Sequence, residues 1–258
     1  MEITNPHKSK LFIGAHPDDI ELSSAVLISR TIQNGGDVFV IYTTDGAPFH
    51  ESYYPRFGIK TKEEYALLRR KESLDALTFL GVPKKNIKFM DYPDQLLAKN
   101  LDSAITKLTK HIEDSRADFI FCPAYEGGHP DHDVTRFISE QALTLCNHNS
   151  LLCEYTEYNN FNGKKSYHKF IPSNNQISRL KFSKEEMKLK VKVMKFFKSQ
   201  EKYLLPFKKD IEMFRIAPQT NFQVFPHERP LYYENVNIKT TPEEIIQFFN
   251  KYIKGESK

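Results

Sequence analysis

Residues 11–21, Leu-Phe-Ile-Gly-Ala-His-Pro-Asp-Asp-Ile-Glu, constrain the fold of this chain more than any other stretch. The apolar run 11–15 is too short for a half-exposed strand, so it suits the buried centre of a parallel sheet. His16, Asp18 and Asp19 follow at the carboxyl end of this strand, just before a predicted helix. A catalytic zinc or similar divalent ion usually takes three imidazole or carboxylate ligands and keeps one position open. His16 and one aspartate are therefore predicted to supply two ligands.

A second stretch repeats this order. Residues 118–124 form another short apolar run, and residues 125–132, Tyr-Glu-Gly-Gly-His-Pro-Asp-His, follow it directly. In a doubly wound sheet the two strands beside the point where the winding reverses are neighbours, and the loops at their carboxyl ends form the ligand-binding crevice. We therefore expect the two His/Asp-rich loops to meet and to complete one set of ligands.

Strands and helices alternate along the first 160 residues. Strands are expected at 11–15, 37–44, 86–90, 118–124 and 151–158, and helices at 20–34, 61–80, 100–116 and 132–146. Such alternation is typical of an α/β fold. We predict a Rossmann-like, doubly wound and mainly parallel sheet of order 3-2-1-4-5, flanked by helices.

The remaining residues, 161–258, are predicted to form a C-terminal extension that packs beside the sheet and shapes the substrate side of the crevice. We expect a strand near 167–171 and a Lys-rich helix over 183–202 in this part. A chain of 258 residues can form one large domain, and no linker divides it, so residues 1–258 are predicted to be a single domain.

Charge and cysteine content narrow the class of protein. The net charge of +4 is small, and the lysines are spread over many predicted helices, so we expect no nucleic-acid partner. Three cysteines in apolar surroundings do not suggest a disulfide framework. No stretch approaches the length of a membrane span, and residues 1–8 have no apolar signal core. The sequence thus predicts a cytoplasmic protein, with a homo-oligomer left open.

The two loops also carry a family resemblance. His-Pro-Asp-Asp at residues 16–19 and His-Pro-Asp-His at residues 129–132 resemble the signature motifs of the PIG-L/LmbE family, zinc-dependent de-N-acetylases of N-acetylated amino sugars and related glycoconjugates. Similarity to the family continues through most of the chain, at residues 68–72, 91–94, 198–200 and 212–218.

This resemblance implies roles for particular residues. It implies His16, Asp19 and His132 as the ligands of one Zn²⁺ per chain, and Asp18 as the general base that acts on the metal-bound water. Fe²⁺ or Co²⁺ could occupy the same ligands. His129 could stabilise an oxyanion or protonate a leaving amine, and the resemblance favours the oxyanion.

Other residues are weaker candidates. Asp131 is expected to orient a histidine, as metal-bound imidazoles usually require. The resemblance implies that Arg69 and Asp94 contact the substrate. Further pocket candidates are Arg56, Tyr125, Glu126 and His227.

Ordinary structural roles compete with these interpretations. Asp18 and Asp19 could cap the following helix, and His129 and His132 could be loop histidines. We expect a metal-dependent hydrolase that removes an acetyl group from an amino sugar. The alternative is a carbohydrate-binding or regulatory protein without hydrolytic activity. An esterase or phosphoesterase is disfavoured, because phosphoryl transfer usually needs two metals or a dense cationic clamp.

Overall fold

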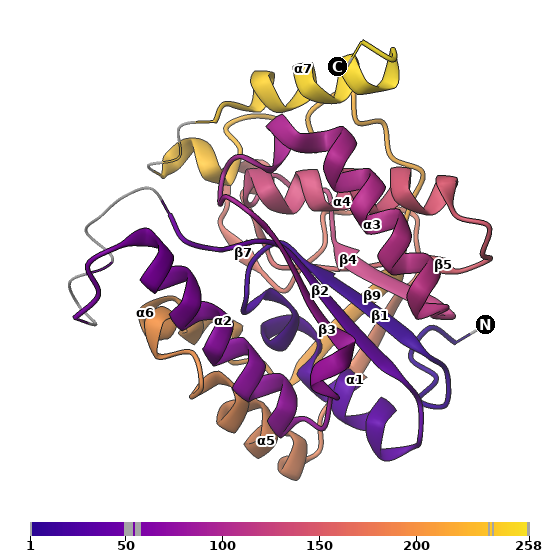
Figure 1. Cartoon of the computed structure of the whole chain (residues 1–258), viewed down its shortest axis with the longest axis vertical. Helices are drawn as coiled ribbons and strands as arrows, with labels where there is room; N and C mark the ends of the chain where they lie inside the picture. Colours follow the sequence, from indigo (N-terminus) through magenta and orange to yellow (C-terminus); the bar gives the residue numbers. More distant parts are fainter. Residues whose placement is uncertain (1, 49–53, 55–57, 237, 239, 257–258) are drawn as a thin grey trace.

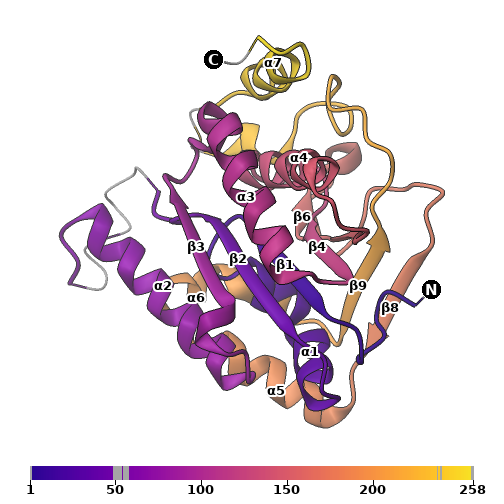
Figure 2. The same cartoon turned by 45° about the vertical axis from the view of Figure 1, so that its right-hand side comes forward.

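The computed structural model describes residues 2–48, 54, 58–236, 238 and 240–256. These residues form a seven-stranded sheet of order β3-β2-β1-β4-β5-β9-β8 (Figure 1; Figure 2). In this order the first five strands, β3, β2, β1, β4 and β5, pair in parallel. Strand β9 pairs antiparallel with β5, and β8 pairs antiparallel with β9. The predicted fold class and the order 3-2-1-4-5 are confirmed. The strands are β1 (Lys10–Gly14), β2 (Val38–Thr44), β3 (Ile87–Tyr92), β4 (Phe119–Pro123), β5 (Leu151–Tyr155), β8 (Ile177–Lys181) and β9 (Ile211–Ile216).

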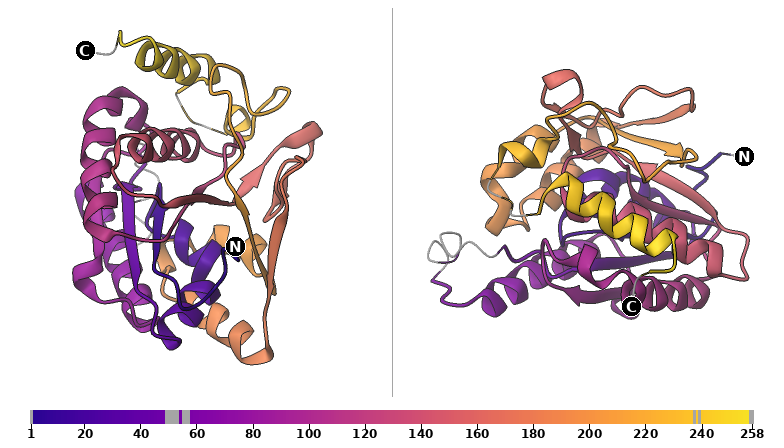
Figure 3. Two further views of the ribbon diagram at one scale, coloured as in Figure 1. Left: turned by 90° about the vertical axis from the view of Figure 1, so that its right-hand side faces the viewer. Right: turned by 90° about the horizontal axis from the view of Figure 1, so that it is seen from above.

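Helices cover both faces of this sheet. One face carries α1 (Asp19–Gln33), α2 (Lys62–Phe79) and α5 (Lys184–Met194), with the short α6 (Glu201–Leu204) close by. The other face carries α3 (Leu101–Ser115), α4 (Pro130–Leu145) and α7 (Pro242–Ile253), and α7 lies at one end of the molecule (Figure 3). A two-stranded ribbon, β6 (Tyr158–Asn159) with β7 (Ser166–Tyr167), follows β5. None of the described helices combines the length and the apolar character that crossing a membrane requires.

The continuous apolar runs explain this layered arrangement. Successive side chains of a strand point to opposite faces of a sheet. Phe12 of β1 therefore belongs to the core beneath α1, α2 and α5, whereas its neighbours Leu11 and Ile13 belong to the core beneath α3, α4 and α7. All three side chains are fully buried, as expected for a central parallel strand with helices on both faces.

The C-terminal part differs in detail from the sequence expectation. The helix predicted over 183–202 ends at Met194, and two short helical turns follow it. The chain turns there because Phe197 is buried in the core and Ser199 binds Glu72 of α2 through its backbone N and its hydroxyl, at 2.9 and 2.5 Å. Strands β8 and β9 join the main sheet, so part of the predicted extension belongs to the sheet itself.

Two buried charged groups fasten this C-terminal part to α1. Glu212 of β9 accepts hydrogen bonds from the backbone N–H groups of Val26 and Leu27, at 2.8 and 2.9 Å. Lys190 of α5 donates to the backbone carbonyls of Glu21 and Leu22. Since α1 begins at Asp19, these contacts hold the helix that starts with the last residue of the first His/Asp-rich motif.

Candidate metal centre

The two motif-bearing loops converge at the carboxyl ends of β1 and β4. These strands are hydrogen-bonded neighbours in the sheet, and the chain leaves both at the same edge. In the second loop, the Asp133 carboxylate accepts from the backbone N–H groups of Glu126 and Gly127, both at 3.1 Å. A Cβ atom on Gly128 would lie 2.1 Å from the carbonyl oxygen of Tyr158, so only glycine fits there. This close approach places β6 against the loop.

Three donor atoms lie at the spacing that a tetrahedral metal ion needs. His16 Nδ1 is 3.3 Å from His132 Nε2 and 3.6 Å from Asp19 Oδ1, and His132 Nε2 is 3.4 Å from Asp19 Oδ1. Tetrahedral zinc with ligands at its usual bond lengths separates neighbouring donor atoms by about 3.3–3.5 Å. These three side chains, all buried, therefore fit a single ion with one coordination position left over.

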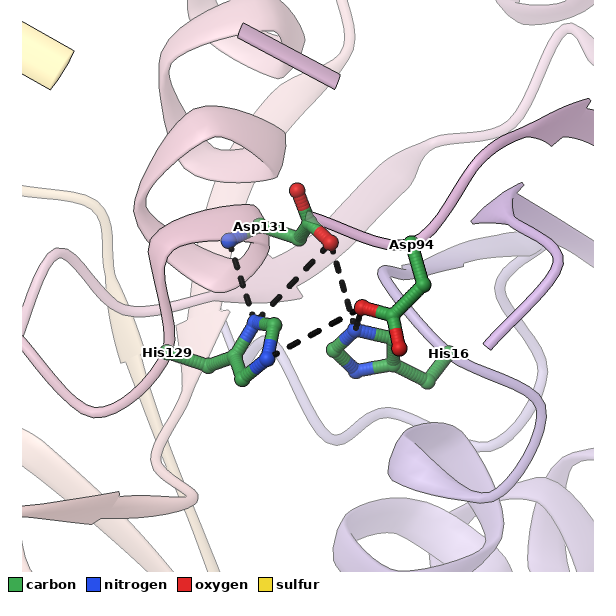
Figure 4. A group of neighbouring side chains, drawn as sticks. All are labelled: His16, Asp94, His129 and Asp131. Atoms are coloured by element: carbon green, nitrogen blue, oxygen red, sulfur yellow. Dashed lines mark hydrogen bonds and ion pairs between the residues drawn. The ribbon is translucent and has the colours of Figure 1, made fainter. Parts of the chain in front are cut away.

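The side chains of this ligand set are oriented by their surroundings. Asp19 Oδ2 accepts hydrogen bonds from the backbone N–H groups of Ala15 and His16, both at 2.9 Å, which leaves Oδ1 for the ion. His16 Nε2, the nitrogen facing away from Asp19 and His132, lies 3.5 Å from both Asp94 Oδ1 and Asp131 Oδ2 (Figure 4). Carboxylates commonly hold the second nitrogen of a metal-bound histidine in this way.

The electrostatics of the set favour a cation. Burial opposes a charged imidazole, yet Asp19, Asp131 and Asp94 together raise the pKa of His16 well above its ordinary value. Burial also opposes the Asp19 carboxylate, but the two histidines hold its pKa well below the usual range. The carboxylates around His16 thus stabilise a positive charge, and a bound divalent ion would provide that charge.

Asp18 lies beside the ligand set and is held by an arginine. Arg69 Nη2 donates to Asp18 Oδ1 at 2.6 Å, and Arg69 Nη1 donates to the carbonyl of Gly46 at 2.5 Å. Arg69 is 6% exposed, so this ion pair is shielded from water. Burial raises the pKa of Asp18 to about 6, although the Arg69 charge opposes the shift. Asp18 is therefore a fixed carboxylate whose proton affinity is increased.

His129 presents one ring nitrogen to the same region. Its Nδ1 accepts from the backbone N–H of Asp131 at 3.2 Å and so caps α4. Burial and the neighbouring His16 lower the pKa of His129 well below its ordinary value, so the ring is neutral. Nε2 then carries the hydrogen, and it lies 3.9 Å from Asp94 Oδ1. His129 is thus oriented as a neutral hydrogen-bond donor.

These residues line a cavity of about 760 Å³. Of the predicted site residues, it brings together His16, Asp18, Asp19, Arg69, Asp94, His129 and His132. Further lining side chains that the sequence analysis did not single out include Glu157, Tyr158, Lys165, Tyr167, Phe207 and Tyr232. Their only sequence signal is their position after the fifth strand or in the aromatic-rich C-terminal part, and neither reveals which residues face the cavity.

Other predicted pocket residues lie elsewhere. The hydroxyl of Tyr125 donates to the carbonyl of Val224, and the Glu126 carboxylate accepts from Thr156, Asn159 and the backbone of Glu157. Neither these two residues nor His227 is among the lining residues of the described cavity. Arg56 lies outside the described residues.

Solved structures of other proteins share this arrangement of strands and helices. The structure resembles a deacetylase from the teicoplanin biosynthesis pathway, with 18% sequence identity, a TM-score of 0.66, and coverage of 83% of this chain and 99% of the other. It also resembles N,N'-diacetylchitobiose deacetylase from Pyrococcus horikoshii (24% identity, TM-score 0.63, coverage of 88% and 91%). The structure is also similar to the 4-carboxy-2-hydroxymuconate hydratase of Pseudomonas putida, with a lower sequence identity of 13% and a TM-score of 0.54. This match covers 83% of this chain and 98% of the other. These likenesses show that the α/β fold is shared, and the hydratase shows that proteins of other activity share it too.

The sequence itself identifies the family. Residues 11–143 match the family model described as PIG-L, GlcNAc-PI de-N-acetylase, so the chain belongs to the PIG-L family. No curated protein matches the sequence significantly. The matched range spans both motif-bearing loops and ends within α4.

Proposed function

We propose that this chain is a zinc-dependent N-deacetylase that hydrolyses the acetamide of an N-acetylated amino sugar. The observation that carries the proposal is the triangle of His16 Nδ1, Asp19 Oδ1 and His132 Nε2, with edges of 3.3–3.6 Å, beside the Asp18 carboxylate. Membership in a family described by a GlcNAc de-N-acetylase supports the choice of substrate.

The remaining residues suit amide hydrolysis. A zinc ion would lower the pKa of water to roughly 7 and polarise the carbonyl. Asp18, which accepts a hydrogen bond from Arg69, would take the proton of the attacking water and later transfer it to the leaving amine. The neutral His129 would donate a hydrogen bond from Nε2 to the oxygen on which negative charge develops. Asp94 and Asp131 would hold His16 in place.

The fold alone does not select this reaction, because a hydratase shares it. The buried Asp18 and Arg69 pair favours hydrolysis over the alternative of a carbohydrate-binding or regulatory protein. A protein that only binds sugar has no use for a buried carboxylate beside the metal ligands.

Two variants test the proposal. Asp18→Asn should retain one zinc ion per chain and lose at least a hundredfold in acetate release from N-acetylated sugars, since the general base is removed. His16→Ala should lose both the ion and the activity, because one of three ligands is missing. The measurements are metal content by mass spectrometry and acetate release by the metal-loaded protein. Full activity of Asp18→Asn, or zinc retained by His16→Ala, would refute these roles.

A further inference from the structure

A lysine in the outer part of the cavity is held between two tyrosines. Lys165 Nζ lies 4.4 Å from the ring centroid of Tyr232 and 5.2 Å from that of Tyr167. Both tyrosines and the lysine line the same cavity as the metal ligands. Although partial burial opposes its charge, hydrogen bonds to Tyr167 and Tyr232 raise the pKa of Lys165. The ammonium group is thus charged and lies against both rings.

The carboxylates of the cavity do not neutralise this lysine. Asp18 pairs with Arg69, Asp19 lies against two histidines, and Asp94 faces His16. Glu157 accepts a hydrogen bond from Ser23, and burial raises its pKa well above the usual value, so it is neutral. Within the described part of the chain, no carboxylate lies within ion-pair distance of Lys165.

Aromatic contacts connect this lysine to the candidate metal centre. The Tyr158 ring lies 5.4 Å from the His132 ring and 4.8 Å from the Tyr232 ring, centroid to centroid. Tyr167 is 6.1 Å from Tyr158 on the same wall. Tyr158, Tyr167 and Tyr232 thus form an aromatic wall of the cavity, with the candidate ligand set at one end and Lys165 at the other.

From this arrangement we propose that Lys165, with Tyr167 and Tyr232, forms an anion-binding subsite. The preferred substrates then carry a phosphate or carboxylate beside the N-acetylated sugar ring. The charged group contacts Lys165 while the acetamide lies at the metal centre. An ammonium that pairs with no carboxylate of the described residues suits this role, because an anionic group of the substrate would supply the opposite charge. This inference rests on the proposed function for the location of the acetamide.

The test compares neutral and anionic sugars on the metal-loaded protein. Acetate release is measured for N-acetylglucosamine, N-acetylglucosamine 1-phosphate and N-acetylmuramic acid. The wild type should prefer at least one of the two anionic sugars. Lys165→Met keeps an apolar chain against the tyrosines, and it should lower the anionic-to-neutral ratio of kcat/KM about three- to tenfold, mainly through KM. Lys164→Met is the matched control, because Lys164 is exposed and does not line the cavity.

A wild type that prefers neither anionic sugar would overturn the proposed subsite. The same holds if Lys165→Met leaves the anionic-to-neutral ratio of kcat/KM unchanged, or if Lys164→Met lowers this ratio equally. Calorimetry gives a second measure that does not need turnover. The metal-loaded wild type should bind glucosamine 1-phosphate more tightly than glucosamine, and Lys165→Met should lose this difference. Absence of acetate release from every sugar, with that binding difference intact, contradicts the proposed function and leaves the subsite supported.

Discussion

At the scale of single residues, the position of Asp18 depends on Arg69 and on the glycine behind it. Gly46 has a φ of +61°, and a Cβ atom there would lie 2.7 Å from Arg69 Nη1. Glycine at this position therefore serves two purposes, since it adopts a left-handed backbone and leaves room for the guanidinium. Arg69 then contacts both the Gly46 carbonyl and the Asp18 carboxylate.

Removing the Arg69 side-chain charge should impair the reaction without unfolding the protein. We expect Arg69→Met to lower kcat about ten- to a hundredfold with a smaller change in KM, because Asp18 loses the group that orients it. Arg70→Met is the control, since Arg70 pairs with Asp91 and stacks on Phe89 away from the cavity. Steady-state kinetics give kcat and KM for both variants, and circular dichroism verifies that both are folded. Equal losses in the two variants would argue against a specific role for Arg69.

At the scale of secondary-structure elements, α1 is one of the two helices that carry the candidate site, the other being α4. Helix α1 begins at Asp19, and its other side is fastened to the C-terminal part by Lys190, Glu212 and an ion pair between Arg30 and Glu186. Glu186 accepts from Arg30 Nε and Nη2 at 2.6 and 2.9 Å and also belongs to the capping box that starts α5. The C-terminal part thus stabilises the helix that carries Asp19, although α5 and β9 contribute no residue to the candidate metal centre.

The ion pair between Arg30 and Glu186 gives a pH-dependent prediction. The arginine lowers the pKa of Glu186 from 4.5 to about 2. Because the folded value is the lower one, the pair stabilises the fold above about pH 4.5, and this contribution disappears as the pH falls toward 2. Glu186→Gln should therefore lower the free energy of unfolding by about 1 kcal/mol at pH 7, after allowance for solvent screening, and by clearly less at pH 3.5.

Denaturant titration at both pH values measures this difference, and Glu185→Gln serves as the control because Glu185 is exposed. A deficit in Glu186→Gln that is equally large at pH 3.5 would mean that its cause is not the charge.

At the scale of the whole molecule, the candidate metal centre lies outside both hydrophobic cores. The cores are formed by strand and helix side chains on the two faces of the sheet, whereas the ligands follow the carboxyl ends of β1 and β4. The fold therefore has its own source of stability, and a bound ion adds to it by mass action.

Metal removal should separate activity from folding. After chelation we expect acetate release to stop and the far-ultraviolet circular dichroism to persist, while the melting temperature falls by roughly 5–15 °C. Added zinc should restore both activity and melting temperature. A chelated protein that unfolds at room temperature, or one that retains full turnover, would contradict this expectation.

The sequence by itself determined the sheet order and the ligand candidates. Apolar runs such as 11–15 indicate burial on both faces of the sheet, and a topological rule then places the loops after the first and fourth strands together. The family resemblance singled out His16, Asp19 and His132 within those loops. The helix start expected at residue 61 is likewise confirmed, because Thr61 and Glu64 form a capping box at the beginning of α2.

Only the tertiary structure decided which distant side chains complete the cavity. Tyr158, Lys165 and Tyr232 carry no local pattern, and their positions depend on how the segment after β5 folds back over the loop at Gly128. Tyr125 adjoins the second motif but turns its hydroxyl to Val224. Secondary-structure periodicity is a local property of the chain, whereas the direction of a loop side chain is set by packing between segments far apart in sequence. For that reason the meeting of the two His/Asp-rich loops was predictable and the wall of the cavity was not.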